Sequence, residues 1–370
     1  MKMGLLEESR HPLFGTSFSN WIYLVFNYHG IDKRFLFKAL FITFSIILFT
    51  PIRIISYILY NNRISRSEIR YPPVFIIGHW RSGTTYLHEL LSQDPRFTYT
   101  SLWQTLIPNG FIVLEDAKKF LSKFLPTTRP MDNVKVDIDG PYEEEAGIAA
   151  LNPWSFFHCF IFPKDADRIF RESVLFDGLN KKEIERWKEN YLWFLKAATY
   201  TCNGKQLLLK NPANTARIKI LLELFPDARF IHIYRNPYKV FVSTRRMRTR
   251  VLEHFALQDI SPEELEEQFI RDYIRLMKTF FEDKKLIPRE HLVEVRYEDL
   301  VEKPMEEVKR IYKNLGLSLT RDAEESMRRY LDKQADYKTN IYTLDREVIE
   351  KVEKNWGFTI KLWNYNPPEN

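Results

Sequence analysis

The stretch "VFIIGHWRSGTTYLHELL", residues 74–91, decides the fold. Its apolar start, preceded by two prolines, predicts a fully buried strand over 71–77, and residues 83–92 predict the helix that follows. Gly78 and Gly83 enclose four residues of the turn between these elements. A glycine-framed turn between a strand and a helix directs several backbone N–H groups towards a ligand at the positive end of the helix. The sequence therefore predicts an anion-binding loop.

The side chains of this loop differ from those of a nucleoside triphosphatase. Thr84 stands where such an enzyme carries its lysine, and the cation comes instead from Arg81, whose guanidinium has a forked donor set suited to phosphate. Ser82 and Thr85 add hydroxyl donors. A magnesium-binding carboxylate would be needed after a nearby strand, but the strand expected at 228–234 ends in Tyr-Arg-Asn. We therefore expect phosphate binding without a metal ion.

Strand patterns alternate with helical patterns along the rest of the chain, around a turn-rich loop at 126–146. Strands are expected at 205–210, 228–234 and 291–297, and helices at 102–125, 180–201, 211–227, from Pro237, at 262–284 and at 303–314. This alternation predicts an α/β, P-loop-like three-layer fold with a central, mainly parallel sheet flanked by helices. Ligands of such sheets bind at the carboxyl ends of the strands. The segments of interest therefore follow three strands: Gly78–Thr85, Lys210–Pro212 and Arg235–Pro237.

A second basic segment, "YRNPYKVFVSTRRM" (234–247), follows another of these strands. It places Arg235 at the strand end and Ser243 eight residues later, about two turns into a helix that begins at Pro237. Arg235 and Ser243 can hold a second phosphate between them. Two anion sites at neighbouring strand ends predict a nucleotide with phosphates at two separated positions. Most of the basic run at 245–250 is expected to form a solvated helix face, and the rest is a candidate to help bind the second phosphate.

Several motifs resemble those of the sulfotransferase superfamily that uses 3′-phosphoadenosine 5′-phosphosulfate (PAPS). "RSGTTY" after a buried strand resembles its 5′-phosphosulfate loop, and "RNPYKVFVS" resembles its 3′-phosphate motif, with the same arginine-to-serine interval. "RYEDLVEKPMEEVKRIYKNLGL" (296–317) resembles its C-terminal strand–helix signature. "LLLKNPANTARI" and "GPYEEEA" are similar to markers of its bacterial branch. The resemblance covers about 71–317.

The resemblance implies the same fold and the transfer of a sulfonyl group from PAPS to an acceptor hydroxyl, or, as the lesser option, an amine. It assigns residues to the donor as follows: Arg81, Ser82, Gly83, Thr84 and Thr85 to the 5′ side, Tyr86 to the adenine, and Arg235 and Ser243 to the 3′-phosphate. Two features of the family pattern are missing. "LLLKNPANT" has no counterpart of the histidine base of cytosolic members, and no C-terminal Arg-Lys-Gly segment is evident.

This chemistry needs a further cation near the sulfonyl group and a base for the proton of the acceptor. Lys210, at a strand end, is the candidate cation. "DGPYEEEA" offers three adjacent carboxylates, of which Glu143 and Glu145 match acidic positions of the family pattern. His88 is the runner-up base, and His79 is a candidate for the acceptor side. The plainer alternatives are a solvated lysine and a helix start rich in glutamate.

Composition narrows the partners. A net charge of +6 and a pI of about 9.0 favour an anionic ligand or surface, and no basic tail or basic–aromatic ladder points to nucleic acid. Cys159 and Cys202 have no disulfide or metal-ligand spacing. The aromatic-rich segments 151–162 and 187–200, with an apolar N-terminal element, suggest a hydrophobic small-molecule acceptor such as a sterol, lipid or phenol.

The N-terminal segment is apolar from about residue 35 to 60. Only Ala39 to Ile52 is uncharged, and these 14 residues fall short of the roughly 20 that a spanning helix needs. A helix lying in a membrane interface and a buried helical hairpin fit equally well, and a tilted span fits less well. We expect an N-terminal segment at 1–70 and an α/β domain at 71–370, with a helical insert at about 102–204. Because no signal peptide is evident, we expect a cytoplasmic protein able to associate with the inner face of a membrane. The sequence does not determine its oligomeric state.

Two other functions fit parts of the pattern. A P-loop-type nucleotide or small-molecule kinase would turn over ATP with magnesium, and the absent loop lysine counts against it. A non-catalytic, membrane-associated nucleotide-binding protein would keep its cellular activity when Arg81 or the acidic cluster is lost.

Overall fold

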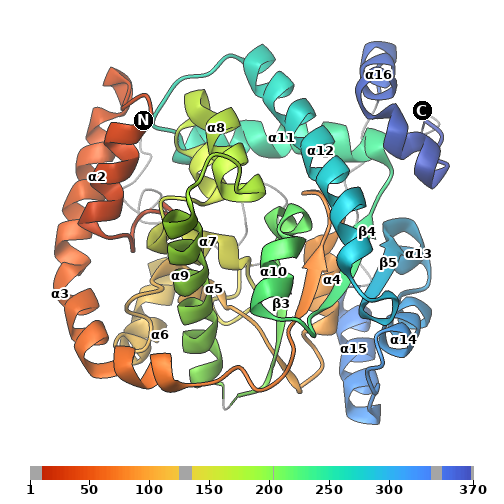
Figure 1. The fold of residues 1–370 in the computed structure, drawn as a ribbon, viewed down its shortest axis with the longest axis horizontal. Coiled ribbons are helices and arrows are strands. Elements are labelled where there is room, and N and C mark those ends of the chain that lie inside the picture. Colours follow the sequence, from red (N-terminus) through yellow and green to blue (C-terminus); the bar gives the residue numbers. More distant parts are fainter. Residues whose placement is uncertain (1–10, 125–135, 203, 335–343, 368–370) are drawn as a thin grey trace. The chain divides into compact units, whose positions relative to one another are not determined.

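The computed structural model describes residues 11–124, 136–202, 204–334 and 344–367 (Figure 1). The first part of the turn-rich loop expected at 126–146 lies outside these residues. The chain forms two compact units. Unit 1 consists of 1–71, 98–206 and 248–265, and unit 2 consists of 72–97, 207–247 and 266–370. The division expected from the sequence, with a boundary at residue 70 and an insert at 102–204, stays a prediction.

The core of unit 2 is built on a five-stranded sheet with the strand order β2-β3-β1-β4-β5. The strands are β1 (Val74–Ile77), β2 (Phe97–Thr98), β3 (Gln206–Lys210), β4 (Arg229–Tyr234) and β5 (Leu292–Arg296). β1 pairs in parallel with β3 and with β4, and β4 pairs in parallel with β5. The three strands predicted after the loop are therefore confirmed to within a residue or two. β3 is almost wholly buried because both faces of a parallel sheet are covered, whereas β5 at the edge of the sheet alternates buried and partly exposed residues.

Alternate residues of these strands face two helical layers. On one face, Val74, Ile76 and Ile231 join a buried cluster with residues of α4 (Thr84–Leu91), α14 (Pro304–Asn314) and α15 (Arg321–Lys333). On the other face, the ring of His232 lies 3.9 Å from that of Phe280 in α12 (Pro262–Asp283). Tyr234 stacks at 4.7 Å on Trp363, at the end of α16 (Arg346–Trp363). The predicted α/β fold with helices on both faces of a mainly parallel sheet is confirmed.

The remaining helices of unit 2 follow the strands closely. They are the 3₁₀ turn Pro212–Ala216, α10 (Ile218–Leu224), α11 (Pro237–Phe255, which continues into unit 1), the 3₁₀ turns Lys284–Leu286 and Arg289–His291, and α13 (Tyr297–Glu302). The basic run on α11 differs in part from its prediction. Arg246 is exposed, but Arg245 pairs with Glu266 at 2.5 Å and Arg248 is only 2% exposed. Arg248 lies over the ring of Phe156, so it belongs to the packing of unit 1.

The described part of unit 1 is helical. Its α-helices are α2 (Phe18–Asn27), α3 (Leu36–Arg66), α5 (Leu102–Leu106), α6 (Lys118–Leu121), α7 (Glu144–Leu151), α8 (Ala166–Phe170) and α9 (Lys181–Tyr200). Short 3₁₀ segments lie at Lys33–Phe35, Glu115–Ala117, Ser122–Phe124, Phe156–Phe160 and Pro163–Asp165, with a π turn at Arg171–Leu175. α9 begins at a capping box between Asn180 and Glu183, and it confirms the helix predicted at 180–201.

Two helical predictions in unit 1 are wrong. The helix expected at 102–125 is broken after α5, because Pro108 removes a backbone donor and Gly110 weakens helix formation in the same stretch. The helical hairpin considered for residues 35–60 does not form. α3 is instead one helix of 31 residues that continues through Pro51. By length and composition, the stretch Lys33–Arg66 is also the one described helix that could cross a membrane, which is weak evidence on its own.

The aromatic-rich segments lie in the core of unit 1. Trp154, Phe156 and Phe162 are at most 2% exposed, and Trp187 stacks on Tyr191 at 4.8 Å with neither ring exposed. These rings therefore hold the helices together. They give no support to the expectation that they line a pocket for a hydrophobic acceptor.

Candidate functional site

The sheet register brings three sequence motifs to one edge of unit 2. Ile76 is aligned with Lys210, the last residue of β3, and Ile77 is aligned with His232 near the end of β4. The segments that follow β1, β3 and β4 therefore leave the sheet side by side. The sequence predicted this edge as the ligand site, because it is where the carboxyl ends of parallel strands meet.

The loop after β1 has a conformation that only glycine permits at two positions. Gly78 has φ 142° and Gly83 has φ 98°, both in the left-handed range. A Cβ at Gly78 would lie 2.2 Å from the carbonyl oxygen of Ile233, and a Cβ at Gly83 would lie 2.2 Å from the ring of Tyr297. The glycines therefore let the backbone turn within a narrow space at the start of α4.

The loop closes on itself through Ser82. The Ser82 hydroxyl donates to the carbonyl oxygen of His79 at 2.5 Å, and its backbone N–H donates to the same oxygen at 3.2 Å. The first N–H groups of α4, at Thr84, Thr85 and Tyr86, have no carbonyl partner within the helix because of their position. They and the half-buried Thr85 hydroxyl are the donors that the predicted anion-binding loop offers.

A side-chain contact joins the two basic motifs, which are 162 residues apart. Arg81 Nε donates to Ser243 Oγ at 2.9 Å. Arg235 Nη1 donates to the carbonyl oxygen of Arg81 at 3.3 Å, and the Arg235 guanidinium lies 4.2 Å from the centre of the Tyr297 ring. The buried Arg235 Nε has no hydrogen-bond partner within the described residues. A guanidinium with a spare donor, held against the backbone of the residue that carries a second guanidinium, fits a ligand with more than one anionic group.

The loop after β3 is hydrogen-bonded to the loop after β1. Gly78 N–H donates to the Thr215 hydroxyl at 2.8 Å, and Asn211 Oδ1 accepts from the backbone N–H of Ala213 at 2.9 Å. Lys210 is 2% exposed at the end of β3. The strand end therefore presents a buried lysine beside a turn that is hydrogen-bonded to the glycine-framed loop after β1.

The two histidines that the sequence singled out both lie in packed surroundings. His88 is 1% exposed, and its Nε2 donates to the carbonyl oxygen of Leu208 at 3.2 Å. Burial, with a smaller effect from the charge of Lys210, lowers the pKa of His88 to about 3. His79 is 4% exposed and lies against the rings of Tyr273 and Trp356.

The three adjacent carboxylates lie in unit 1, at the start of α7. Glu145 is 1% exposed, and its Oε1 accepts from Phe156 N–H at 2.7 Å and from Ser155 Oγ at 2.9 Å. Glu144 is also buried and accepts from the Tyr191 hydroxyl at 3.1 Å. Glu143 occupies the N-cap position, is half-buried and makes no side-chain capping bond. The three neighbours are therefore in different environments.

Sequence reasoning missed several residues that shape this site. Thr215 and Tyr297 limit the space around the two loop glycines. The segment after α16 reaches the Arg235 turn, since Asn236 Nδ2 donates to the carbonyl oxygen of Asn366 at 3.2 Å. Tyr365 donates to Glu298 at 2.6 Å in the same place. The sequence has no basic C-terminal segment of the kind that the family carries. The aromatic and amide residues of "LWNYN" (362–366) were the signal that could have shown that this segment lies near Arg235.

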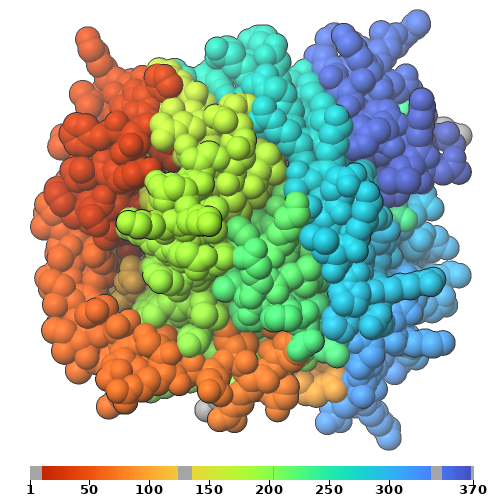
Figure 2. All heavy atoms as spheres, viewed as in Figure 1, coloured from red at the N-terminus to blue at the C-terminus, as the bar shows by residue number. Residues whose placement is uncertain are grey.

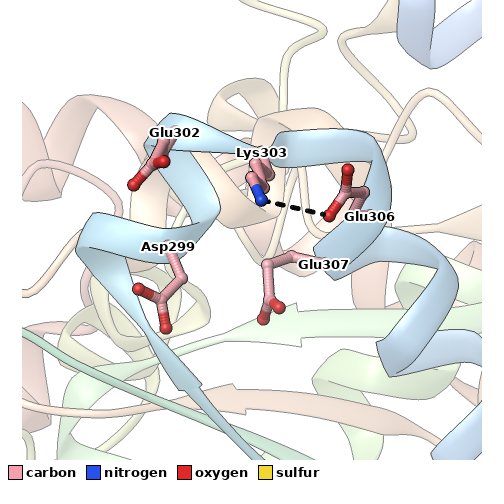
Figure 3. A pocket seen from close by; sticks show the side chains of 5 residues that line it. All are labelled: Asp299, Glu302, Lys303, Glu306 and Glu307. Atoms are coloured by element: carbon pink, nitrogen blue, oxygen red, sulfur yellow. Dashed lines mark ion pairs between the residues drawn. The ribbon is translucent and has the colours of Figure 1, made fainter.

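A surface hollow elsewhere on unit 2 has the wrong charge for the same ligand. It lies where α13 meets α14 and is lined by Asp299, Glu302, Lys303, Glu306 and Glu307 (Figure 3). Its one lysine is 3.9 Å from Glu306. Four carboxylates would repel a phosphate, so this hollow does not suit a nucleotide. Among the described residues, no group of three or more His, Cys, Asp or Glu side chains is arranged to hold a metal ion.

Comparison with known proteins identifies the family. The sequence pattern described as "Sulfotransferase family" matches residues 72–321, more than half of the chain. The chain belongs to the sulfotransferase family. It is 32% identical over 357 residues to the omega-hydroxy-beta-dihydromenaquinone-9 sulfotransferase Stf3 of Mycobacterium bovis, and equally to that of Mycobacterium tuberculosis. These alignments cover 96% of this chain and 92% of each relative. This sulfotransferase is therefore an enzyme, and the kinase and non-catalytic alternatives are not supported.

Solved structures show the same fold. The sulfotransferase STF9 of Mycobacterium avium superposes with a TM-score of 0.66 at 20% identity, over 86% of this chain and 83% of the other. The sulfotransferase STF1 of Mycobacterium tuberculosis H37Rv gives a TM-score of 0.64 at 16% identity, over 96% and 94%. At these identities the similarity establishes the architecture.

Proposed function

We propose that this sulfotransferase transfers the sulfonyl group of PAPS to a hydroxyl group of a hydrophobic lipid acceptor. The observation that carries the proposal is the contact between Arg81 Nε and Ser243 Oγ. It places the cation of the glycine-framed loop next to the serine of the second basic motif. The two groups suit the 5′ and 3′ phosphates of one nucleotide better than the linear triphosphate of ATP.

On the donor side, the loop would bind the 5′-phosphate. Arg81 and the N–H groups of residues 84–86 would stabilise the charge that collects on this phosphate when its bond to sulfur breaks. Arg235, Thr85 and Ser243 would complete the phosphate contacts, and Tyr86 would lie against the adenine. The donor supplies the activated sulfonyl group, and the leaving group is adenosine 3′,5′-bisphosphate.

On the acceptor side, a new bond forms between the acceptor oxygen and sulfur as the bond from sulfur to the phosphate oxygen breaks. Lys210 would stabilise the sulfonyl and bridging oxygens. The proton of the hydroxyl would pass to Glu143, because Glu145 and Glu144 are buried and already accept hydrogen bonds within unit 1. His88 suits this role less well, since its lowered pKa makes it a weak base.

The similarity to Stf3 favours a lipid acceptor. Stf3 is named for a hydroxylated menaquinone derivative, and it aligns with nearly the whole of this chain. We extend to this enzyme only the class of acceptor, an apolar lipid that ends in a hydroxyl. Such a molecule resides in a bilayer, so we place the enzyme at the cytoplasmic face of a membrane.

Radiolabelled transfer tests this function. The purified enzyme is incubated with PAPS labelled at sulfur and, in turn, with a hydroxylated polyprenyl quinol, a sterol and a simple phenol. We expect label in the lipid product and release of adenosine 3′,5′-bisphosphate in equal amount. Transfer to the phenol alone would contradict the lipid assignment. Hydrolysis of ATP with magnesium, in place of transfer, would contradict the donor assignment.

A further inference from the structure

The outer faces of α2 and α3 form an apolar surface that no described residue of unit 1 covers. Many large apolar side chains on these helices are between 39% and 78% exposed: Phe18, Ile22 and Phe26 on α2, and Leu36, Phe37, Leu40, Phe44, Ile47, Leu48, Ile54, Ile55, Tyr57, Ile58 and Leu59 on α3. The α2 residues follow one another at intervals of four, and each of the α3 residues has another of the set three or four positions away, as residues on one face of a helix do. Figure 2 shows both helices, red to orange, at the surface of the molecule. We call these residues the α2–α3 face.

Side chains along the whole length of α3 form hydrogen bonds with other parts of unit 1. Near its start, Lys38 Nζ donates to the carbonyl oxygen of His254 at 2.9 Å. In the middle, Arg53 Nη1 donates to the carbonyl oxygen of Thr16 at 3.0 Å. Near its end, Asn61 Oδ1 accepts from Trp193 Nε1 at 2.9 Å. A helix that crossed a bilayer would give up these bonds and carry at least one of Lys38 and Arg53 into hydrocarbon, which is costly.

The charges on α3 favour an anionic surface. The helix contains four basic residues and no Asp or Glu. Arg63 and Arg66 are exposed at its end, and Lys33 is exposed just before its start. The apolar face is thus bracketed by cations, an arrangement that suits apolar side chains among lipid tails and basic ones among anionic head groups. A second copy of this chain would bring the same cations together, so charge favours a bilayer over a dimer.

We propose that the α2–α3 face docks unit 1 on a bilayer with anionic head groups, with α3 lying in the plane of the interface. The axis of α3, about 46 Å long, would run along the membrane surface. Only the reason for docking, which is to bring the enzyme to a lipid acceptor, rests on the proposed function. Docking itself depends on no step of the transfer reaction.

Vesicle co-sedimentation tests the apolar contact. We expect the full chain to bind vesicles of phosphatidylcholine with phosphatidylglycerol, and the combined variant Phe37→Ser, Phe44→Ser and Ile58→Ser to bind roughly 100-fold more weakly. A matched control replaces three exposed apolar residues of unit 2, by Leu286→Ser, Val301→Ser and Leu362→Ser. The control is expected to bind as the unchanged chain does. Equal binding by the first variant and the unchanged chain would overturn the proposal.

Vesicle composition tests the charge. The combined variant Lys33→Gln and Arg63→Gln is expected to bind the anionic vesicles roughly 30-fold more weakly. On vesicles of phosphatidylcholine alone it should bind as the unchanged chain does. An equal effect on both kinds of vesicle would contradict the role of head-group charge.

Three further outcomes separate the competing arrangements. Alkaline carbonate is expected to release the enzyme from vesicles, and retention would indicate a spanning helix. Sedimentation velocity without lipid is expected to give the same mass for the apolar variant and the unchanged chain. A dimer that only the variant lacks would assign the face to self-association. Vesicle binding without sulfonyl transfer would overturn the proposed function and leave the docking surface standing.

Discussion

The glycine-framed loop after β1 in unit 2 and the acidic segment at the start of α7 in unit 1 are both short polar motifs at the start of a helix, yet their side chains lie in different environments. In the loop, backbone conformation is fixed by Gly78 and Gly83, and Arg81 donates to Ser243 on another element. In the acidic segment, Glu144 and Glu145 are buried and hydrogen-bonded inside unit 1, while Glu143 is half-buried at the cap. In the loop the glycines set one backbone conformation for the whole motif, whereas the three adjacent glutamates of the acidic segment end in different environments.

Among substitutions in the two motifs, we expect Arg81→Ala to have the largest effect on sulfonyl transfer. Arg81→Ala removes the cation of the loop and its bond to Ser243. Loss of a preorganised charged donor is expected to lower kcat/KM for sulfonyl transfer about 10³-fold. Steady-state kinetics with PAPS measures this, with melting temperature as the control for folding. A loss below tenfold would mean that the cation for the leaving phosphate lies elsewhere.

Glu143→Gln gives the next largest effect. If Glu143 takes the proton of the acceptor, its amide cannot, and kcat is expected to fall roughly 100-fold or more. Binding of adenosine 3′,5′-bisphosphate should be unchanged, since the residue acts on the acceptor. Single-turnover kinetics and calorimetry check the two expectations. Full turnover in the variant would show that a residue other than Glu143 is the base.

Glu145→Gln is expected to act on stability. The variant weakens two hydrogen bonds to a buried carboxylate, from Phe156 N–H and the Ser155 hydroxyl. The expected cost is about 2 kcal/mol in the free energy of unfolding, or a few degrees in melting temperature. Glu143→Gln is the matched control and should shift the melting temperature much less. If instead Glu145→Gln melts normally and loses turnover, the assignments of the two carboxylates are reversed.

The smallest effect concerns pH and the core beside the loop. Burial lowers the pKa of His88 from 6.5 to about 3. Between these two pH values His88 is therefore protonated in the unfolded chain and neutral in the folded one. Stability is therefore expected to fall as pH drops from about 6.5 towards 3, by about 1.4 kcal/mol per pH unit for this group. His88→Gln keeps an N–H donor for Leu208 and removes the titration. Thermal melting at pH 7 and pH 5 should show a smaller difference in the variant than in the unchanged chain, and an identical difference would contradict the burial of a neutral His88.

Much of unit 2 was predictable from the sequence, because its signals are local. A run such as "VFII" between prolines and a glycine can hardly be anything but a buried strand, and a glycine at a positive φ marks a turn. The Arg235-to-Ser243 interval likewise depends only on helix geometry.

Unit 1 was harder to predict, because its decisive contacts are remote in sequence. Nothing near Glu145 shows that Ser155 and Phe156 will hold its carboxylate, and nothing near Arg248 shows that it will be buried over Phe156. The aromatic-rich stretches also look alike whether they line a pocket or fill a core. Pro51, although proline disfavours the interior of a helix, lies within α3. Tertiary packing decides such cases, and composition cannot anticipate it.

The central claim is that Arg81 and Ser243 join two phosphate sites for one nucleotide. Calorimetry with adenosine 3′,5′-bisphosphate, adenosine 5′-monophosphate and ATP with magnesium tests it most directly. We predict that the bisphosphate binds about 10- to 100-fold more tightly than the monophosphate, since the 3′-phosphate adds charge-assisted hydrogen bonds, and that magnesium has no effect on its binding. Equal affinity for the bisphosphate and the monophosphate, or tighter binding of ATP with magnesium, would contradict the account.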